Sequence, residues 1–237
     1  MRDPRARLIV ETLPAPGETV PIAPEETAHA RARRLTTGDP VVLLDGSGRV
    51  AAAQVVRLTH REVFVRVSAI LPAERRRPRP ALFVAAVRAH RISWIVEKAT
   101  ELDAGRVTLV ESGRTQSFRA SPRLLLKLDR VAREAAKQCG RAEWPGVSGP
   151  VSFAHSLEEV ADHRLLLDFD GDRFPERLAP TSAALLVGPE GGWTEEERGT
   201  ASQRGWTVVR LPAGKLRAET AAVAGLVLLR AAFERFR

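Results

Sequence analysis

Beyond residue 80 the chain alternates short apolar segments with segments of helical periodicity. Residues 91–102, for example, carry apolar side chains at 92, 95, 96, 99 and 102, the stripe of an amphipathic helix. Strand-like apolar segments cover residues 81–87, 106–110, 165–168, 183–187 and 206–211. Such alternation predicts a parallel-rich sheet with helices on both faces. The predicted fold class is therefore α/β.

Helix start signals support this interpretation. Ser121-Pro122 combines a good N-cap with a proline at the first helical position, and it predicts a long helix. Ser156–Glu159 and Thr194–Glu197 both have the spacing of a capping box. Residues 218–236 are predicted to form the last helix.

The first seventy residues follow a different pattern. Residues 24–35 resemble a helix, with a proline in the first turn followed by two glutamates. A hairpin turn is predicted at Asp45–Gly48, where glycines tolerate positive φ. Strands are predicted at residues 8–10, 40–44, 50–58 and 62–70. This pattern predicts a small β-barrel or sandwich.

A proline- and arginine-rich segment separates the two patterns. Residues 71–80 hold three prolines and four arginines, a composition that predicts an extended, solvated linker. We therefore divide the chain into a β-domain at 1–71, a linker at 72–80 and an α/β domain at 81–237.

Composition excludes several classes of protein. The single cysteine, Cys139, rules out an internal disulfide, and its predicted position in the middle of a helix suggests packing rather than catalysis. The five histidines are scattered without metal-ligand spacing, so no metal is expected. No apolar run is long enough to span a bilayer, and no secretory leader opens the sequence. We expect a cytoplasmic protein without a membrane partner.

The formal charge of +8 is unevenly placed. Residues 1–80 hold 14 Lys or Arg against 9 Asp or Glu, whereas the remainder holds 23 against 20. A basic excess in the first third suggests a polyanionic partner such as a nucleic acid. An arginine-rich composition with ordinary solvated faces would give the same count.

The segment Val187–Thr194 is the strongest candidate for a ligand site. It joins a predicted apolar strand to a predicted capped helix, and the carboxyl edge of an α/β sheet is where ligands bind. Glycines 188, 191 and 192 allow the backbone to approach a ligand closely, and Pro189 stiffens the turn. A tight strand-to-helix turn without a ligand has the same signature. The segment is neither a Rossmann fingerprint nor a Walker loop, so a nucleotide-dependent oxidoreductase is disfavoured.

A second candidate segment, Leu211–Ala221, also joins a strand to a helix and is expected at the same edge of the sheet. It crowds Lys215, Arg217 and Glu219 beside an alanine-rich helix. A surface loop whose Glu219 complements the helix dipole is the alternative.

These two segments together resemble the ribosomal RNA small subunit methyltransferase E family. The resemblance rests on Gly188-Pro189-Glu190-Gly191-Gly192 and on Leu211 with Leu216–Ala221. Supporting blocks occur in the family's order at residues 98–102, 111–115 and 134–141, and the front domain matches at Gly38-Asp39 and Asp45–Gly48. The chain departs from the usual motif at Gly113, Trp193, Pro212, Gly214 and Lys215.

The resemblance implies a SPOUT-type α/β domain with a C-terminal trefoil knot, preceded by a PUA-like RNA-binding β-domain. It further implies a homodimer that uses S-adenosylmethionine, and no metal, to methylate N3 of one uridine in small-subunit (16S) ribosomal RNA. The substrate is naked RNA or RNA within an assembled 30S subunit. A non-catalytic RNA-binding ribosome-assembly factor with a vestigial methyltransferase domain is the alternative.

Candidate catalytic, RNA-binding and donor-binding residues follow from the expected reaction. Arg114 and Arg217 are candidates to stabilise an anion developing on uracil, and Glu190 or Glu219 to accept its proton. A structural ion pair is the alternative role for each of them. RNA binding is expected through Arg31, Arg33 and Arg34, which we predict on one short helix, and a solvated helix face is the alternative. The candidate donor-binding residues are Leu167, Asp168, Gly188, Pro189, Glu190, Gly191, Gly192, Leu211, Leu216 and Thr220.

Overall fold

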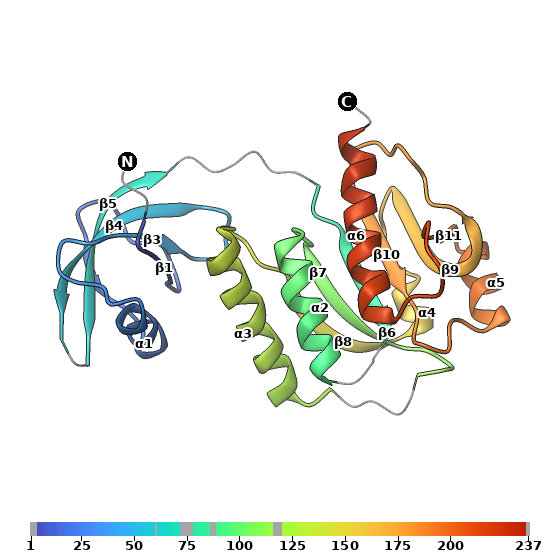
Figure 1. Ribbon diagram of the computed structural model, residues 1–237, viewed down its shortest axis with the longest axis horizontal. Coiled ribbons are helices and arrows are strands. Elements are labelled where there is room, and N and C mark those ends of the chain that lie inside the picture. The colour runs from blue at the N-terminus through green and yellow to red at the C-terminus, as the bar shows by residue number, and fades with distance from the viewer. Residues whose placement is uncertain (1–3, 60, 72–77, 86–88, 116–119, 236–237) are drawn as a thin grey trace. The chain divides into compact units, whose positions relative to one another are not determined.

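The computed structural model describes residues 4–59, 61–71, 78–85, 89–115 and 120–235 (Figure 1). Contacts divide the chain into two compact units, residues 1–76 with 136–143, and residues 77–135 with 144–237. The predicted linker 72–80 lies outside the described residues except for its last three positions. Each unit has its own hydrophobic core.

The first unit is built on a five-stranded mixed sheet with the order β1-β3-β4-β5-β2. β1 runs parallel to β3, and the other neighbouring strands are antiparallel. The elements are β1 (Ala6–Ile9), β2 (Thr19–Pro21), α1 (Pro24–Ala32), β3 (Pro40–Leu44), β4 (Val50–Leu58) and β5 (Val63–Leu71). Leu8, Leu43 and Val65 are fully buried in its core.

The turn between β3 and β4 confirms the predicted hairpin. The backbone N–H of Ser47 donates to Oδ1 of Asp45 at 3.0 Å, so the aspartate closes the turn with its own side chain. β2, by contrast, was not predicted, because three residues are too few for a periodic pattern to show.

Helix α1 is shorter than predicted. It ends at Ala32, and Arg34 adopts a φ of 53°, the left-handed conformation that terminates helices. The N–H of Leu35 then donates to the carbonyl of Ala30 at 3.0 Å, which satisfies an end-of-helix acceptor. The prediction that all three candidate RNA-binding arginines lie on this helix is therefore wrong, since only Arg31 does. Arg31, Arg33 and Arg34 are all exposed.

A buried ion pair lies in the first unit. Nζ of Lys137, in the last turn of the helix α3 (Pro122–Cys139), lies 2.7 Å from Oε1 of Glu26 in α1. The two side chains are only 4% and 9% exposed. Charges this deep are tolerated only when paired, because desolvation penalises each of them.

The second unit is built on a six-stranded parallel sheet with the order β11-β9-β10-β6-β7-β8. Every neighbouring pair in it is parallel, as the strand–helix alternation predicted. Its strands are β6 (Ala81–Ala85), β7 (Arg106–Glu111), β8 (Gly146–Ser152), β9 (His163–Arg173), β10 (Ala183–Val187) and β11 (Thr207–Arg210). The helices are α2 (Ala89–Glu101), α3, α4 (Phe153–Ser156), α5 (Glu195–Gln203) and α6 (Ala218–Glu234).

Helices cover both faces of this sheet (Figure 1). Along β10, Leu185 and Val187 belong to a core shared with α2, α3 and α6. Ala184 and Leu186 face the opposite way and pack in a second core with Ala201 of α5. This division follows from the two-residue period of a strand.

Two local predictions in this unit were wrong, and one strand was missed. Ser156 does not begin a helix, because Ser152 caps α4 and the Ser156 hydroxyl donates to the carbonyl of Phe153 at 2.6 Å. β8 was missed because Gly146, Gly149 and Pro150 weaken its strand signal, although an edge strand tolerates such residues. Cys139 is the exposed last residue of α3 rather than a packed residue in its middle.

Candidate active site

The carboxyl ends of β9, β10 and β11 lead into one cavity of about 460 Å³. This volume lies in the range of small-molecule sites, and the placement is the one expected for an α/β sheet. Three chain segments supply most of the lining, namely residues 167–170, 187–193 and 210–216. Its charged residues are Arg114, Asp168, Asp170, Glu190, Glu195, Arg198, Arg210 and Lys215. The lining therefore offers both donors and acceptors to a ligand of mixed charge.

The loop after β10 is held in a narrow turn. The N–H of Gly192, at a φ of 69°, donates to the carbonyl of Pro189 at 2.9 Å. A Cβ at Gly188 would lie 3.0 Å from the ring of Trp193, a tighter contact than most Cβ atoms make, so glycine favours this close approach. Trp193 is 3% exposed, and its Nε1 donates to the carbonyl of Leu167 at 3.0 Å. The indole thus ties the loop to the end of β9.

The capping box of α5 begins the helix and also binds the segment that follows β7. The Thr194 hydroxyl accepts from the N–H of Glu197 at 3.1 Å, and Oε2 of Glu197 accepts from the N–H of Thr194 at 2.8 Å. Oε1 of the same carboxylate accepts from the N–H of Gly113 at 2.7 Å. Glu197 therefore docks the segment after β7 against the start of α5.

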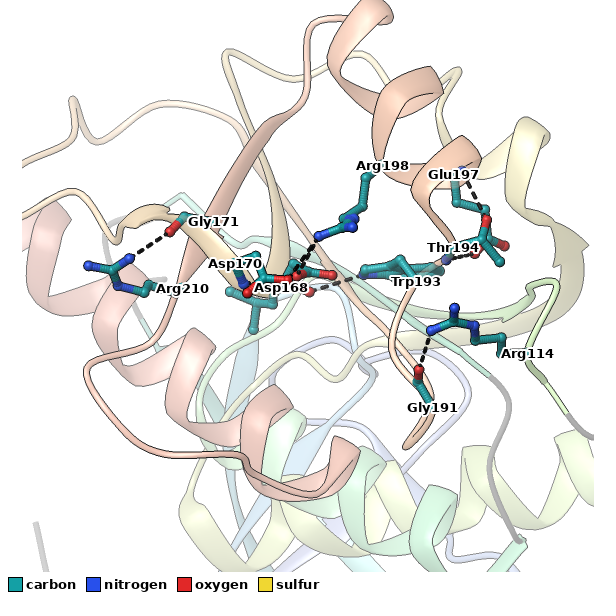
Figure 2. A network of polar contacts seen from close by, with 11 residues as sticks. Arg114, Asp168, Asp170, Gly171, Gly191, Trp193, Thr194, Glu197, Arg198 and Arg210 are labelled. Carbon is teal, nitrogen blue, oxygen red and sulfur yellow. Dashed lines mark hydrogen bonds and ion pairs between the residues drawn. The ribbon is translucent and has the colours of Figure 1, made fainter.

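That docking places Arg114 at the cavity. Its Nη1 donates to the carbonyl of Gly191 at 2.7 Å, as Figure 2 shows. The remaining guanidinium N–H groups are not engaged by this bond. Arg114 lines the cavity and is supported from two sides, by Gly191 and, through Gly113, by Glu197.

A bulge within β9 forms part of the cavity wall. Leu166 pairs with Val208 of β11, but the next residue of β11, Val209, pairs with Asp172. The intervening residues project as a bulge in which Phe169 is 65% exposed. Arg198 of α5 braces this bulge, with Nη1 3.5 Å from Oδ1 of Asp168 and 3.2 Å from Oδ2 of Asp170 (Figure 2).

The segment before α6 carries two exposed cations. Lys215 lines the cavity, and Arg217 is the N-cap residue of α6 without a side-chain cap. Glu219 lies in the first turn of α6, where its charge complements the helix dipole. Its Oε1 lies 3.6 Å from Nε of Arg91 in α2, and Arg91 also bonds Glu190.

The structure brings most of the predicted site residues together. Arg114 and nine of the ten candidate donor-binding residues line the cavity, namely Leu167, Asp168, Gly188, Pro189, Glu190, Gly191, Gly192, Leu211 and Leu216. Arg217, Glu219 and Thr220 are outside the lining, one turn or less from it along the chain. Thr220 is exposed. No group of three metal-ligating side chains occurs among the described residues.

Sequence reasoning missed five residues of this site: Arg91, Phe169, Asp170, Arg198 and Arg210. A signal existed for Arg91, because a cation in the first turn of a helix opposes the dipole and α2 has no acid there to balance it. Arg210 donates to the carbonyl of Gly171 at 3.2 Å, a contact that depends on the β9 bulge. No local pattern predicts such a bulge.

Comparisons with known proteins agree with this geometry. A family model described as an RNA methyltransferase domain matches residues 75–230. A parallel sheet with a cavity at its carboxyl edge, together with this match, defines the class: the chain is an RNA methyltransferase by family. More narrowly, it belongs to the ribosomal RNA small subunit methyltransferase E family, because relatives of that name exceed 30% identity over most of both chains.

Two relatives and two solved structures illustrate the likeness. The Mycobacterium bovis protein of that name is 31% identical over 231 residues, 92% of this chain and 88% of the relative. The Synechocystis protein is 30% identical over 214 residues, 86% and 70% of the two chains. A methyltransferase structure from Legionella pneumophila with bound SAM matches at TM-score 0.86 and 26% identity, over 96% of this chain and 97% of that one. A Neisseria gonorrhoeae methyltransferase E structure shares the fold, at TM-score 0.87, 23% identity and 95% and 96% coverage.

The part of the chain that the structure describes contains no helix long and apolar enough to cross a membrane.

Proposed function

We propose that the protein methylates N3 of one uridine in small-subunit (16S) ribosomal RNA, with S-adenosylmethionine as the methyl donor. One observation carries this proposal: the Gly188–Gly192 loop and the Leu211–Leu216 segment, which hold the family's motifs, line one cavity. The curated relatives carry the name of a ribosomal RNA methyltransferase, and the Legionella structure contains the donor.

The residues of the cavity fit this donor. Gly188 and Gly192 leave the loop without side chains that would fill the space, and a Cβ at Gly192 or Gly214 would meet no atom within 4 Å. Leu167, Leu211 and Leu216 offer apolar surface for a planar base. Asp168 and Glu190 offer carboxylates for hydroxyl or cationic groups. When bound, S-adenosylmethionine supplies an activated methyl group on a sulfonium.

The chain's own residues handle the acceptor. The N3 proton of uracil must leave, and a cation near O2 or O4 would stabilise the resulting charge. Arg114 is braced at the cavity for this role, and the exposed Arg217 is the second candidate. Glu219 and Glu190 are the candidate proton acceptors, directly or through water. Both contact Arg91.

The domain assignment is part of the proposal. Residues 1–71 would form a PUA-like RNA-binding domain that docks the substrate through Arg31, Arg33 and Arg34, which are exposed in the structure. Residues 81–237 would form the methyltransferase domain, with the C-terminal trefoil knot of the SPOUT class. The protein would act in the cytoplasm as a homodimer, on naked RNA or on an assembled 30S subunit.

Two measurements test the proposal. Calorimetric titration should show S-adenosylmethionine binding, with no need for added metal. Mass mapping of 16S ribosomal RNA from a deletion strain should show one uridine lacking a methyl group, and the purified protein should restore it on naked RNA or on 30S subunits.

The alternative, a non-catalytic ribosome-assembly factor, predicts no affinity for the donor and unchanged methylation in the deletion strain. That result would refute the proposed activity. A methyl group restored at a carbon or a ribose oxygen would instead refute the N3 assignment and leave the methyltransferase activity.

A further inference from the structure

Arg91 contacts both segments that carry the family's motifs. The guanidinium donates from Nη1 to Oε1 of Glu190, which lies in the loop after β10. Its Nε lies 3.6 Å from Oε1 of Glu219, which lies in the first turn of α6 after the second segment. Arg91 thus joins residues that are far apart in the sequence.

The position of Arg91 is unfavourable for the helix that carries it. A cation in the first turn of α2 meets the positive end of the helix dipole, and that turn has no acidic residue. The side chain is only 20% exposed, so water screens it poorly. The two carboxylates offset both costs. The contacts with the loops, rather than any contribution to α2, therefore account for an arginine here.

Glu219 depends on Arg91. Its side chain is 16% exposed, and its Oε2 is buried without a hydrogen-bond partner among the residues described. An incompletely satisfied carboxylate is costly to bury, and removal of its neighbouring cation would increase that cost. Without Arg91 the first turn of α6 would have to move to bring Glu219 to water.

Neither Arg91 nor Glu219 lines the cavity, whereas Glu190 and Ala218 do. Arg91 is therefore placed to act on the loops and not on a ligand. An arginine can serve both carboxylates at once because its planar guanidinium presents several donors in different directions.

We propose that Arg91 is a positioning residue for the methyl donor: it clasps the Gly188–Gly192 loop to the start of α6 and so keeps the cavity in its binding geometry. This inference rests on the proposed function, since it presumes that the cavity binds S-adenosylmethionine. It adds a residue from α2 to a site otherwise built from β9, β10 and β11, the segments that follow β7 and these strands, and the starts of α5 and α6.

The test is calorimetric titration of S-adenosylmethionine into the full-length protein and its variants. Arg91→Gln should raise the dissociation constant roughly tenfold, the equivalent of one lost ion-pair contact. Glu190→Gln should weaken binding as well, and the double variant should lose less affinity than the sum of the two single losses, because both single changes remove the same contact. Arg91→Lys should recover only part of the affinity, because one ammonium group cannot replace the guanidinium in both contacts.

Lys98→Gln is the matched control. Lys98 lies on the same helix and pairs with Glu97 and Glu101 at 2.7 and 2.8 Å, away from both loops. Its loss should leave the dissociation constant unchanged. In steady-state assays Arg91→Gln should raise the KM for the donor, whereas Lys98→Gln should leave that KM unchanged.

The outcomes separate this inference from the function on which it rests. If the wild-type protein does not bind the donor, the proposed function is refuted, and the positioning role of Arg91 is refuted with it. If the wild type binds and Arg91→Gln binds equally well, or if the effects of Arg91→Gln and Glu190→Gln simply add, the clasp alone is refuted. Should Arg91→Gln unfold, Arg91→Lys and Glu190→Gln decide the matter, since full affinity in both would exclude a clasp.

Discussion

The indole Nε1 of Trp193 donates to the backbone carbonyl of Leu167 at 3.0 Å, which joins the loop after β10 to the end of β9. Both partners are buried, with exposures of 3% and 7%, so water cannot replace the bond. The ring also packs against Phe153, with centroids 5.1 Å apart. One side chain thus links two of the three segments that line the cavity.

Trp193→Phe should therefore destabilise the protein and weaken donor binding. It keeps an aromatic ring but leaves the Leu167 carbonyl without its donor, at a cost of about 1–3 kcal/mol. Trp206→Phe is the control, because Trp206 donates in the same way to Leu157 at 3.3 Å and does not line the cavity. Both variants should unfold at lower temperature by calorimetry, and only Trp193→Phe should raise the dissociation constant for S-adenosylmethionine. Equal donor affinity in the two variants would contradict this role of Trp193.

Gly188→Ala should also weaken donor binding. The new Cβ would lie 3.0 Å from Cε2 of Trp193, so the ring, which is bonded to Leu167, would have to shift by a few tenths of an ångström. Strain of this kind typically costs about 1–3 kcal/mol. Gly199→Ala is the control: a Cβ there meets nothing within 4 Å, and alanine in a helix should stabilise the protein by about 0.5–1 kcal/mol. Thermal unfolding measures the effect on stability, and calorimetric titration measures the effect on donor affinity. If Gly188→Ala changed neither, the loop would have space for a methyl group at this position.

Breaking the buried Glu26–Lys137 pair should be far more damaging than breaking an exposed one. Glu26→Gln removes one partner of a buried ion pair, a change that typically costs about 3–5 kcal/mol. Replacing both, as Glu26→Leu with Lys137→Met, should recover most of that loss. Glu62→Gln breaks the exposed pair with Arg57 and should cost less than about 1 kcal/mol. Denaturant unfolding of the four proteins provides the comparison, and a similar loss in the two single variants would rule out special importance of the buried pair.

Asp162 should make the stability of the second unit depend on pH in the acid range below 3.8, the usual pKa of an aspartate. Hydrogen bonds from the side chains of Ser182 and Thr181 and from the Ser182 backbone hold the pKa of Asp162 below its usual 3.8. A lowered folded-state pKa means that the stabilisation is fully present above pH 3.8 and is lost as the pH falls through the folded value. Asp162→Asn should therefore lower the unfolding temperature at pH 7 and have a diminishing effect as the pH falls below 3.8. An equal effect at both extremes would show that the ionised form is not favoured.

Reversing charge at Arg33 and Arg34 should separate RNA binding from donor binding. Arg33→Glu with Arg34→Glu should weaken RNA binding and reduce its dependence on salt, since fewer counterions would be released. Donor affinity should not change, because the cavity is built wholly from residues of the second unit. The same reversal at the exposed Arg123 and Arg130 of α3 matches the change in net charge and should have a smaller effect on RNA binding. Loss of RNA binding and donor binding together would indicate a folding defect and contradict the separate location of the two binding sites.

Much of the second unit could be predicted from local patterns. Residues 183–187 form β10 as expected, because a short apolar run bounded by polar residues has few alternatives to a buried strand. Thr194 caps α5 as expected, because the capping box is satisfied within one helical turn. The site's place at the carboxyl edge followed from the same alternation of strands and helices, and the family resemblance is confirmed.

Local patterns failed where a contact depends on distant residues. Ser156–Glu159 has the residue types and spacing of a capping box, yet Ser152 is the N-cap of α4. The spacing alone does not determine in which turn a helix begins. Arg91 reaches Glu190 across 99 positions, and Arg198 braces Asp168 across 30. Periodicity describes which face of an element is buried, but these pairs exist only because the parallel sheet brings the ends of β9, β10 and β6 together. Hydrogen bonds within a turn are settled by neighbours along the chain, whereas the charges and carbonyls that brace the cavity find their partners only after the sheet and its helices have packed.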